Sequence, residues 1–350
     1  MMNVPKISVI IPMYNAAKYV GVCLESLLNQ TFQDFEVIVV DDCSTDSSFA
    51  VVESYAPKFN GRLKVLRMQK NSGSAGTPRN KGLLLSRGEY VFFLDADDLI
   101  TVTGLEELYT LAKNFDAEVV YCENYYVTDF EFSEVVIHCP QMGGASVDKP
   151  TFETNDFEER LNRIKRYMFI VTAGLKLIKR NLLMEHEIFF PHTKNREDDI
   201  WTWNLVFHTK KFLRVPNIVY VCRLVDNSIT RVEGKPEQGL NFWINPVILG
   251  LKTLDEIMSR VEFFLENPQH RYAMLFYFVE VSFLLMQKYT LKESPFEVFK
   301  AIREKFSDVL GEQDVLVPVL CSFITAQQQL IANQRQRIDE LEQTFEEKIL

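Results

Sequence analysis

The sequence predicts an α/β fold in which a doubly wound, mostly parallel sheet is followed by a helical C-terminal extension. Three observations predict it. Short apolar runs that are typical of strands buried on both faces alternate with helical patterns over residues 6–100. Polar, acid-rich loops follow these runs, and after residue 231 the pattern becomes helical and aromatic-rich. Strands that alternate with helices favour a parallel sheet with right-handed crossovers.

The individual elements are expected in this order. Strands are predicted at residues 7–11, 35–40, 63–66, 90–94, 118–126, 174–178 and 215–223, and helices at residues 16–30, 47–59, 78–86, 103–115, 156–167 and from 198. Pro12 is expected to end the first strand, and Pro78 suits the first turn of a helix. Residues 130–154 are predicted to be irregular. The predicted domains are residues 1–232, a helical domain at 233–322, and a helical tail at 323–350 with a weak coiled-coil pattern.

The bulk composition is that of an ordinary globular protein. Of the 350 residues, 47% are hydrophobic and 25% are charged, and the formal net charge is −10. Because binding to nucleic acid needs a basic patch, no nucleic-acid partner is expected. The longest apolar run, residues 273–286, is too short to span a membrane and contains Glu280. Six scattered cysteines without a CxxC pair suit a reducing compartment, so a cytoplasmic location is predicted.

The stretch Gly88–Ile100, GEYVFFLDADDLI, organises the first domain. A buried strand leads directly into Asp95, Asp97 and Asp98. Open α/β sheets bind ligands at the carboxyl ends of their strands, and three carboxylates there repel one another unless a cation or hydrogen-bond donors compensate them. Mg²⁺ or Mn²⁺ bound together with substrate phosphates would do so. A solvated acidic turn that caps the next helix is the alternative.

Two further loops are expected at the same edge of the sheet. The loop Met13-Tyr14-Asn15 follows the first strand, and DDCSTD, which begins with Asp41 and Asp42, follows the second. The first loop lacks the G-x-G-x-x-G pattern of a dinucleotide site, and the chain has no phosphate-binding P-loop. Binding of an NAD-type cofactor is therefore not expected.

Five motifs follow one another along the chain: ISVIIPMYN, FEVIVVDDCSTDSS, NSGSAGTPRNKGL, GEYVFFLDADD and REDDIW. In this order they resemble the inverting family 2 glycosyltransferases of the bacterial surface-glycan type, over residues 6–230. The resemblance implies the GT-A fold, which is a Rossmann-like α/β fold. It also implies a metal-dependent glycosyltransferase of the hexosyltransferase type, with Mn²⁺ or Mg²⁺ as cofactor and a nucleotide sugar, above all a UDP-sugar, as donor.

The resemblance places a nucleotide site on these motifs. Tyr14 would flank the base, and Asp42 would accept a hydrogen bond from uracil, with helix capping as the alternative. Asp41 would lie near the ribose or be a buried structural acid. Arg79 would lie near the diphosphate, or form a salt bridge with Asp41 or Asp95. The implied nucleotide ligands are Pro12, Tyr14, Asn15, Asp41, Asp42, Arg79, Asp95 and Ala96.

Asp95 and Asp97 match the family's DxD pair, in which one carboxylate contacts the ribose and the other contacts the metal. Both are therefore candidate metal ligands. Asp98 is close enough in sequence to be a third metal ligand or a capping residue, and the sequence does not rank it.

The family also needs a general base, because a sugar hydroxyl is too weak an acid to attack the anomeric carbon unassisted. The base is usually found in a Glu-Asp pair that opens a helix, here Glu197-Asp198. Asp198 is the predicted base. Asp199 could share that role, and Glu197 could hold the acceptor instead. The alternative is that all three acids only cap the helix.

The resemblance implies a surface-polysaccharide or lipid-linked glycan as acceptor. Association with the inner face of the cell membrane and self-association through the C-terminal helices are both left open. From a different class, the chain could be a non-catalytic, nucleotide-sugar-binding subunit that organises a glycan-assembly complex.

Overall fold

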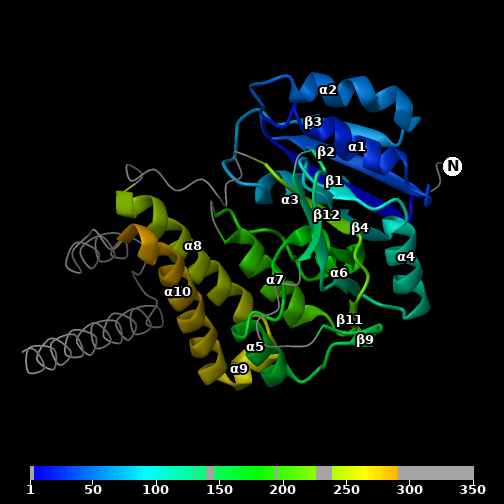
Figure 1. Cartoon of the computed structure of the whole chain (residues 1–350). Helices are drawn as coiled ribbons and strands as arrows, with labels where there is room; N and C mark the ends of the chain where they lie inside the picture. Colours follow the sequence, from blue (N-terminus) through cyan, green and yellow to red (C-terminus); the bar gives the residue numbers. More distant parts are fainter. Residues whose placement is uncertain (1–3, 130, 139–145, 194–195, 226–238, 291–350) are drawn as a thin grey trace, which may run out of the picture. The chain divides into compact units, whose positions relative to one another are not determined.

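The computed structural model describes residues 4–129, 131–138, 146–193, 196–225 and 239–290 (Figure 1). It divides the chain into two compact units, residues 1–233 and 234–350. The first unit contains two β-sheets with helices, and the described part of the second unit is helical. The predicted tail at residues 323–350 lies outside the described residues.

The main sheet of the first unit has eight strands. They are β1 (Ile7–Met13), β2 (Phe35–Asp41), β3 (Leu63–Arg67), β4 (Tyr90–Phe93), β6 (Val119–Cys122), β9 (Thr151–Phe152), β10 (Lys176–Lys179) and β11 (Phe212–Val215). Their order across the sheet is β3-β2-β1-β4-β10-β6-β11-β9. All run in the same direction except β10 and β9, which are antiparallel to their neighbours. The prediction of a mostly parallel α/β sheet is confirmed.

A second, four-stranded sheet lies beside the end of the acidic turn. Its strands are β5 (Leu99–Ile100), β7 (Tyr125–Asp129), β8 (Val135–His138) and β12 (Tyr220–Leu224), in the order β5-β12-β7-β8. Strand β5 follows directly on the acidic residues after β4 and pairs with β12. The pairing therefore places β12 next to these acidic residues. This sheet therefore connects the acidic turn to a part of the chain more than 120 residues away.

Helices connect the strands of the first unit. They are α1 (Val20–Leu28), α2 (Ser48–Tyr55), α3 (Gly76–Leu85), α4 (Gly104–Asn114), α5 (Phe157–Lys165), α6 (Arg180–Glu185) and α7 (Glu197–His208), with the short 3₁₀ helices η1 (Ala56–Phe59) and η2 (Ala173–Leu175). Every residue of β1, β2 and β4 is buried, which explains their unbroken apolar sequences. Gly82 lets α3 approach β1 closely, since a Cβ there would lie 2.3 Å from Cγ2 of Ile10.

The second unit contains α8 (Gly239–Met258), α9 (Glu262–Glu266) and α10 (Pro268–Thr290). Helix α10 packs on both α8 and α9, and its residues Leu275, Phe278 and Val279 are fully buried. The aromatic-rich helical pattern predicted for this region is present over the described residues. None of the helices that the structure describes is long and apolar enough to cross a membrane.

Strand β1 does not end at Pro12 as predicted but continues to Met13. Its pairing with β4 stops where Ile10 lies opposite Phe93, so only β2 lies alongside Pro12. A proline lacks the N–H donor that a strand with two neighbours needs, but it is tolerated where one side is open.

The prediction of a single strand at residues 118–126 is wrong, because this run is divided between β6 and β7 in different sheets. The division falls at Glu123, which is fully buried. Its carboxylate pairs with the Arg214 guanidinium and accepts a hydrogen bond from the backbone N–H of Val147 at 2.7 Å. The hydrogen-bond and ion-pair partners of Glu123 are distant in sequence. The residues around Glu123 therefore do not indicate that a strand ends there.

The strand predicted at residues 215–223 is likewise two strands. Val215 ends β11 and Tyr220 begins β12, and the break includes Pro216, which cannot donate to a ladder. Residues 130–154 are also not wholly irregular, because β8 and β9 lie within them as edge strands. Both edge strands are exposed along their whole length, so they lack the buried apolar face that a sequence pattern reveals.

Candidate active site

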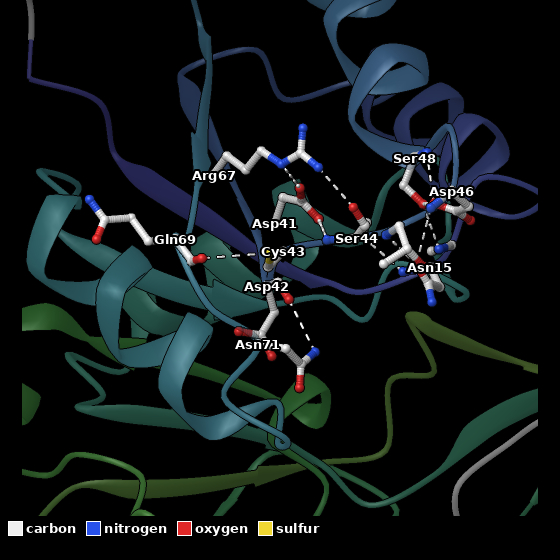
Figure 2. A network of polar contacts seen from close by, with 12 residues as sticks. Asn15, Asp41, Asp42, Cys43, Ser44, Asp46, Ser48, Arg67, Gln69 and Asn71 are labelled. Carbon is white, nitrogen blue, oxygen red and sulfur yellow. Dashed lines mark hydrogen bonds and ion pairs between the residues drawn. The ribbon is translucent and has the colours of Figure 1, made fainter.

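The loops that follow β1 and β2 are joined by hydrogen bonds (Figure 2). The backbone N–H of Asn15 donates to Oγ of Ser44 at 2.9 Å, and Oδ1 of Asn15 accepts from the backbone N–H of Thr45 at 2.8 Å. Asn15 has a left-handed backbone with φ of 49°, a conformation that asparagine tolerates better than most residues. The predicted convergence of these two loops is therefore present, with the Tyr14 side chain exposed beside them.

Asp41 is a fully buried acid at the end of β2. Its Oδ1 accepts from the backbone N–H of Ser44 at 3.0 Å, and its Oδ2 lies 3.3 Å from Nε of Arg67. Of the two roles left open for Asp41, these contacts favour the structural one. The salt bridge suggested between Arg79 and Asp41 does not form, because Arg67 takes that place.

Asp42 is held by the loop after β3. Its carboxylate oxygens accept from the backbone N–H of Ser72 at 2.9 and 3.0 Å and from Oγ of the same residue at 2.9 Å, and only 3% of Asp42 is exposed. The alternative that Asp42 caps α2 is wrong, since the backbone N–H of Ser48 at the start of that helix is bonded by Asp46. Recognition of uracil by Asp42 stays a prediction.

The acidic turn after β4 separates its three carboxylates. Asp95 is half-buried, and Ala96 beside it is buried. Burial, together with the negative charge of Asp95, raises the pKa of Asp97 to about 6. Asp98 points away from this pair, with Oδ2 accepting from the hydroxyl of Tyr220 at 2.6 Å and Oδ1 accepting from the backbone N–H of Arg223 at 2.8 Å.

Strand β12 thus fixes the acidic turn from outside the motif. The Arg223 side chain donates to the backbone carbonyl oxygens of Asp97 and Tyr19, which adds a second connection between β12 and the turn. Each carboxylate oxygen of Asp98 therefore accepts one hydrogen bond from β12, a contact that the sequence did not predict, and the role of Asp98 as a third metal ligand stays a prediction. Helix α4 has Thr103 at its N-terminus, so Asp98 does not cap it.

The position of Tyr220 depends on Gly174, since a Cβ at residue 174 would lie 2.2 Å from Cε2 of the Tyr220 ring. We expect Gly174→Ala to destabilise the protein by about 1–3 kcal/mol, because the displaced ring cannot find room in a packed core. Urea unfolding would measure the loss. Gly21→Ala is the control: its Cβ would only meet the tip of the flexible Tyr55 side chain at 3.3 Å, so this variant should be neutral or stabilised. Equal stability of both variants would contradict the assigned packing.

Arg79 connects the acidic turn to α7. Its Nη2 lies 2.8 Å from Oδ1 of Asp95, and its Nη1 lies 2.8 Å from Oδ1 of Asp198. The Arg79 side chain is only 4% exposed, whereas those of Asp95 and Asp198 are 31% and 32% exposed. The guanidinium lies 5.1 Å from the centre of the Phe190 ring. One buried cation therefore joins the first acid of the DxD pair to the predicted base, and both acids keep a solvent-facing side.

The three acids at the start of α7 have different surroundings. Asp199 pairs with Arg196 at 3.0 Å, whereas Asp198 pairs with Arg79. Burial and the charge of Asp198 raise the pKa of Glu197 to about 7. Burial also raises the pKa of Asp198, against the opposing effect of the Arg79 charge. The carboxylates of Asp198 and Asp199 are bound to arginines, so capping alone does not account for them.

Sequence reasoning did not find Ser72, Arg67, Tyr220 or Arg223. Each of these residues holds an acid of the site, and the sequence gives no signal for the contacts. Tyr220 and Asp98 are 122 positions apart, and Arg223 lies in a strand without a recognisable motif. The pairing of β12 with β5 brings Tyr220 and Arg223 beside the acidic turn.

The residues present fit a divalent metal in part. Asp95 and Asp97 supply two carboxylates at one place, and their mutual repulsion, which raises the pKa of Asp97, is the kind that a cation relieves. Within the described ranges, no group of three or more His, Cys, Asp or Glu side chains is placed to hold a metal ion. Mg²⁺ commonly binds to one or two carboxylates and completes its shell with substrate phosphates and water.

A family model described as glycosyl transferase family 2 matches residues 8–187. The chain belongs to this family. This chain is 34% identical to a curated member of the family, the poly(ribitol-phosphate) beta-glucosyltransferase of Bacillus spizizenii. The match covers 59% of this chain and 30% of that protein. The chain is 30% identical to glycosyltransferase GlyG of Streptococcus pneumoniae over 65% of this chain and 73% of that one.

Solved structures share the fold of this family 2 protein. Staphylococcus aureus TarS 1–349 in complex with UDP has a TM-score of 0.60 at 24% identity, covering 95% of this chain and 91% of that one. The complex of the same protein with UDP-GlcNAc has a TM-score of 0.59 at 25% identity, covering 92% and 81%. The chain spans only 30%, 59% and 32% of the length of the first three curated relatives it matches.

Proposed function

We propose that this family 2 protein is a metal-dependent, inverting glycosyltransferase. It would move a sugar from a nucleotide sugar, preferably a UDP-sugar, to a hydroxyl of a surface-polysaccharide or lipid-linked glycan. The observation that carries the proposal is the Arg79 bridge, which puts Asp95 and Asp198 on either side of one guanidinium. Transfer needs a donor-binding acid and a proton acceptor at one place, and two carboxylates joined by one guanidinium support the assignment of these roles to Asp95 and Asp198.

The relatives support the choice of donor and acceptor. TarS structures are described with UDP and with UDP-GlcNAc, and the names of several relatives describe transfer to poly(ribitol-phosphate). Both facts belong to those proteins. They favour a uridine nucleotide and a surface polymer here, because this chain carries the same family's motifs in its first unit.

In the proposed reaction, Asp198 accepts the proton of the acceptor hydroxyl as the new glycosidic bond forms. The bond from the anomeric carbon to the diphosphate breaks in the same displacement, which inverts the anomeric centre. Asp95 and Asp97 would hold the divalent ion, Mn²⁺ or Mg²⁺, whose chemistry when bound is to stabilise charge on the leaving diphosphate. Asp42, Tyr14 and Pro12 would lie along the nucleotide.

The side chain of Arg79 has a second purpose in this scheme. Its positive charge lowers the pKa of Asp198 against the effect of burial, so the carboxylate is more readily available as a base at neutral pH. Glu197 is an alternative general base. Its pKa of about 7 lies near the working pH, where a general base is most effective. We favour Asp198 because it shares Arg79 with Asp95.

The proposal is tested by incubating the protein with a set of nucleotide sugars and Mn²⁺ and measuring release of the nucleoside diphosphate. Slow hydrolysis of one donor would support transferase activity and identify the sugar without knowledge of the acceptor. Tight binding of a nucleotide sugar with no turnover of any donor, with or without acceptor polymer, would favour the non-catalytic subunit instead. The cytoplasmic or membrane-associated location and self-association stay predictions.

Asp97→Asn should abolish the metal-dependent part of UDP affinity, because one of two candidate metal-binding charges is removed while the side-chain shape is kept. Titration calorimetry with UDP, with and without Mn²⁺, measures this. Asp148→Asn is the control, since it removes the same charge from an exposed loop. If Asp97→Asn binds UDP as well as the parent in the presence of Mn²⁺, the metal assignment is wrong.

A further inference from the structure

Lys176 is a fully buried lysine at the start of β10. Its ammonium nitrogen donates to the backbone carbonyl oxygens of Ile170 at 2.7 Å and Thr172 at 2.8 Å. It also lies 5.4 Å from the centre of the Tyr121 ring and 5.9 Å from that of Trp201. Lysine is rarely buried unless it is paired, so this position requires a reason beyond packing.

The segment that Lys176 holds is also attached to the helix that carries the candidate base. Residues 170–172 lie between α5 and β10, and the hydroxyl of Thr202 on α7 donates to the carbonyl oxygen of Val171 at 2.8 Å. The hydroxyl of Tyr121 on β6 accepts from the backbone N–H of Ile170 at 2.8 Å. Three elements therefore fix three consecutive residues, and Lys176 supplies the only cation among these contacts.

The charge of Lys176 acts on Asp198. The groups that influence Lys176 are Asp198 on α7, Arg79 on α3 and Cys122 on β6, and burial lowers the pKa of Lys176 to about 7. The charged groups that interact with Asp198 include Arg79, Asp95 and Lys176 from other elements and its neighbours Glu197 and Asp199 on α7. The two cations lower the pKa of Asp198, whereas Asp95 and burial raise it. Asp198 is bonded to one buried cation, Arg79, and the second, Lys176, lies 5.9 Å from the centre of the Trp201 ring, three positions further along the same helix.

We propose that Lys176 is a positioning residue for the transfer reaction: it anchors residues 170–172, which Thr202 joins to α7, and provides a second positive charge beside the start of that helix. This inference rests on the proposed function. Lys176 touches neither donor nor acceptor in this scheme. It acts through the carboxylate of Asp198, whose ionised form its charge favours, and through the backbone of residues 170–172 that it anchors.

The variant Lys176→Met removes the charge and keeps a similar volume. Below pH 7 Lys176 carries a positive charge that favours ionised Asp198, so its loss raises the pKa of Asp198. At low pH, kcat rises with pH as the base ionises. This acid limb of the pH profile should move to higher pH by on the order of one unit, so kcat at a fixed pH on that limb should fall about tenfold. The donor KM should change little, because the donor does not contact Lys176.

Thr202→Val is the matched control. It removes a different side-chain hydrogen bond to residues 170–172, the one to the carbonyl oxygen of Val171, and leaves every charge in place, so it should not move the acid limb. Lys176→Arg keeps the charge and should retain the limb of the parent. If Lys176→Met does not fold, Lys176→Gln takes its place, because an amide can still donate to the carbonyls without a charge.

The ionisation of Asp198 can also be followed without turnover. Carboxyl ¹³C NMR of aspartate-labelled protein would give its titration midpoint, assigned by the signal missing in Asp198→Asn. A midpoint that rises in Lys176→Met and not in Thr202→Val supports the inference. Equal midpoints in the parent and Lys176→Met overturn it, whether or not the protein turns over a donor. Absence of turnover in the parent with every nucleotide sugar would instead count against the proposed function.

Discussion

Asp198→Asn is expected to lower kcat by about 10²–10⁴-fold and to leave donor affinity nearly unchanged. A general base acts as the proton leaves the acceptor hydroxyl, so its loss affects the transition state much more than the bound donor. Asparagine keeps the size of the side chain, and its amide oxygen can still accept from Arg79. The fold should therefore remain intact, and UDP titration with Mn²⁺ beside a transfer assay separates the two effects.

The neighbouring acids are matched controls for this experiment. Asp199→Asn changes the same chemistry one position along the helix, but Asp199 pairs with Arg196 and not with Arg79. Glu197→Gln removes the acid whose pKa is about 7. Full activity of Asp198→Asn, with loss in one of the other two, would transfer the role of base to that residue. Full activity of all three would remove the start of α7 from the mechanism.

The sequence predicts well those elements whose burial appears as a pattern in their own residues. Strands β1, β2 and β4 are buried on every residue, so each appears as an apolar run, and the loops after them carry their acids at fixed places. Asp95, Asp97 and Asp98 could be proposed as ligands because they follow a buried strand, and the pair Asp95 and Asp97 was singled out by the family resemblance. The edge strands β8 and β9 lack such a pattern because every residue in them is exposed.

The parts that could not be predicted depend on contacts between distant residues. Strand β10 runs antiparallel between β4 and β6, although alternation of strands and helices suggests only parallel neighbours. The role of Asp98 depends on Tyr220 and Arg223, and no local feature distinguishes Asp98 from the two acids before it. A motif can therefore locate an acid, but its hydrogen-bond partners decide which acids remain open to a ligand.

Arg79 is the clearest case of a residue whose partners were only partly foreseen. The salt bridge to Asp95 was among the expected alternatives, and the structure contains it, but the second bond to Asp198 was not expected. The two carboxylates, at positions 95 and 198, lie 103 positions apart in the sequence. Their connection through one guanidinium makes Arg79 the point where donor binding and proton transfer would meet.

We expect Arg79→Met to destabilise the protein by roughly 3 kcal/mol and to reduce transfer by at least about 10²-fold. The variant leaves two half-buried carboxylates without their shared cation, and displacement of either one misplaces a reacting group. Lysine is not an adequate substitute, because it cannot bind two carboxylates as a planar fork does. Arg79→Lys should therefore recover part of the stability and little of the activity.

The pH dependence distinguishes this account from a simple packing defect. Burial already raises the pKa of Asp198 in the folded protein, and without Arg79 that pKa rises further, so above the unfolded pKa of this group the unfolded state holds fewer protons than the folded state. The loss of stability should therefore be small at pH 4 and grow as the pH rises through the folded pKa values, which thermal unfolding at pH 4 and pH 8 would reveal. Lys58→Met is the control, because both side chains of its pair with Glu25 are exposed to solvent. A loss in Arg79→Met that is the same at both pH values would mean that Arg79 contributes by packing and not by bridging the two carboxylates.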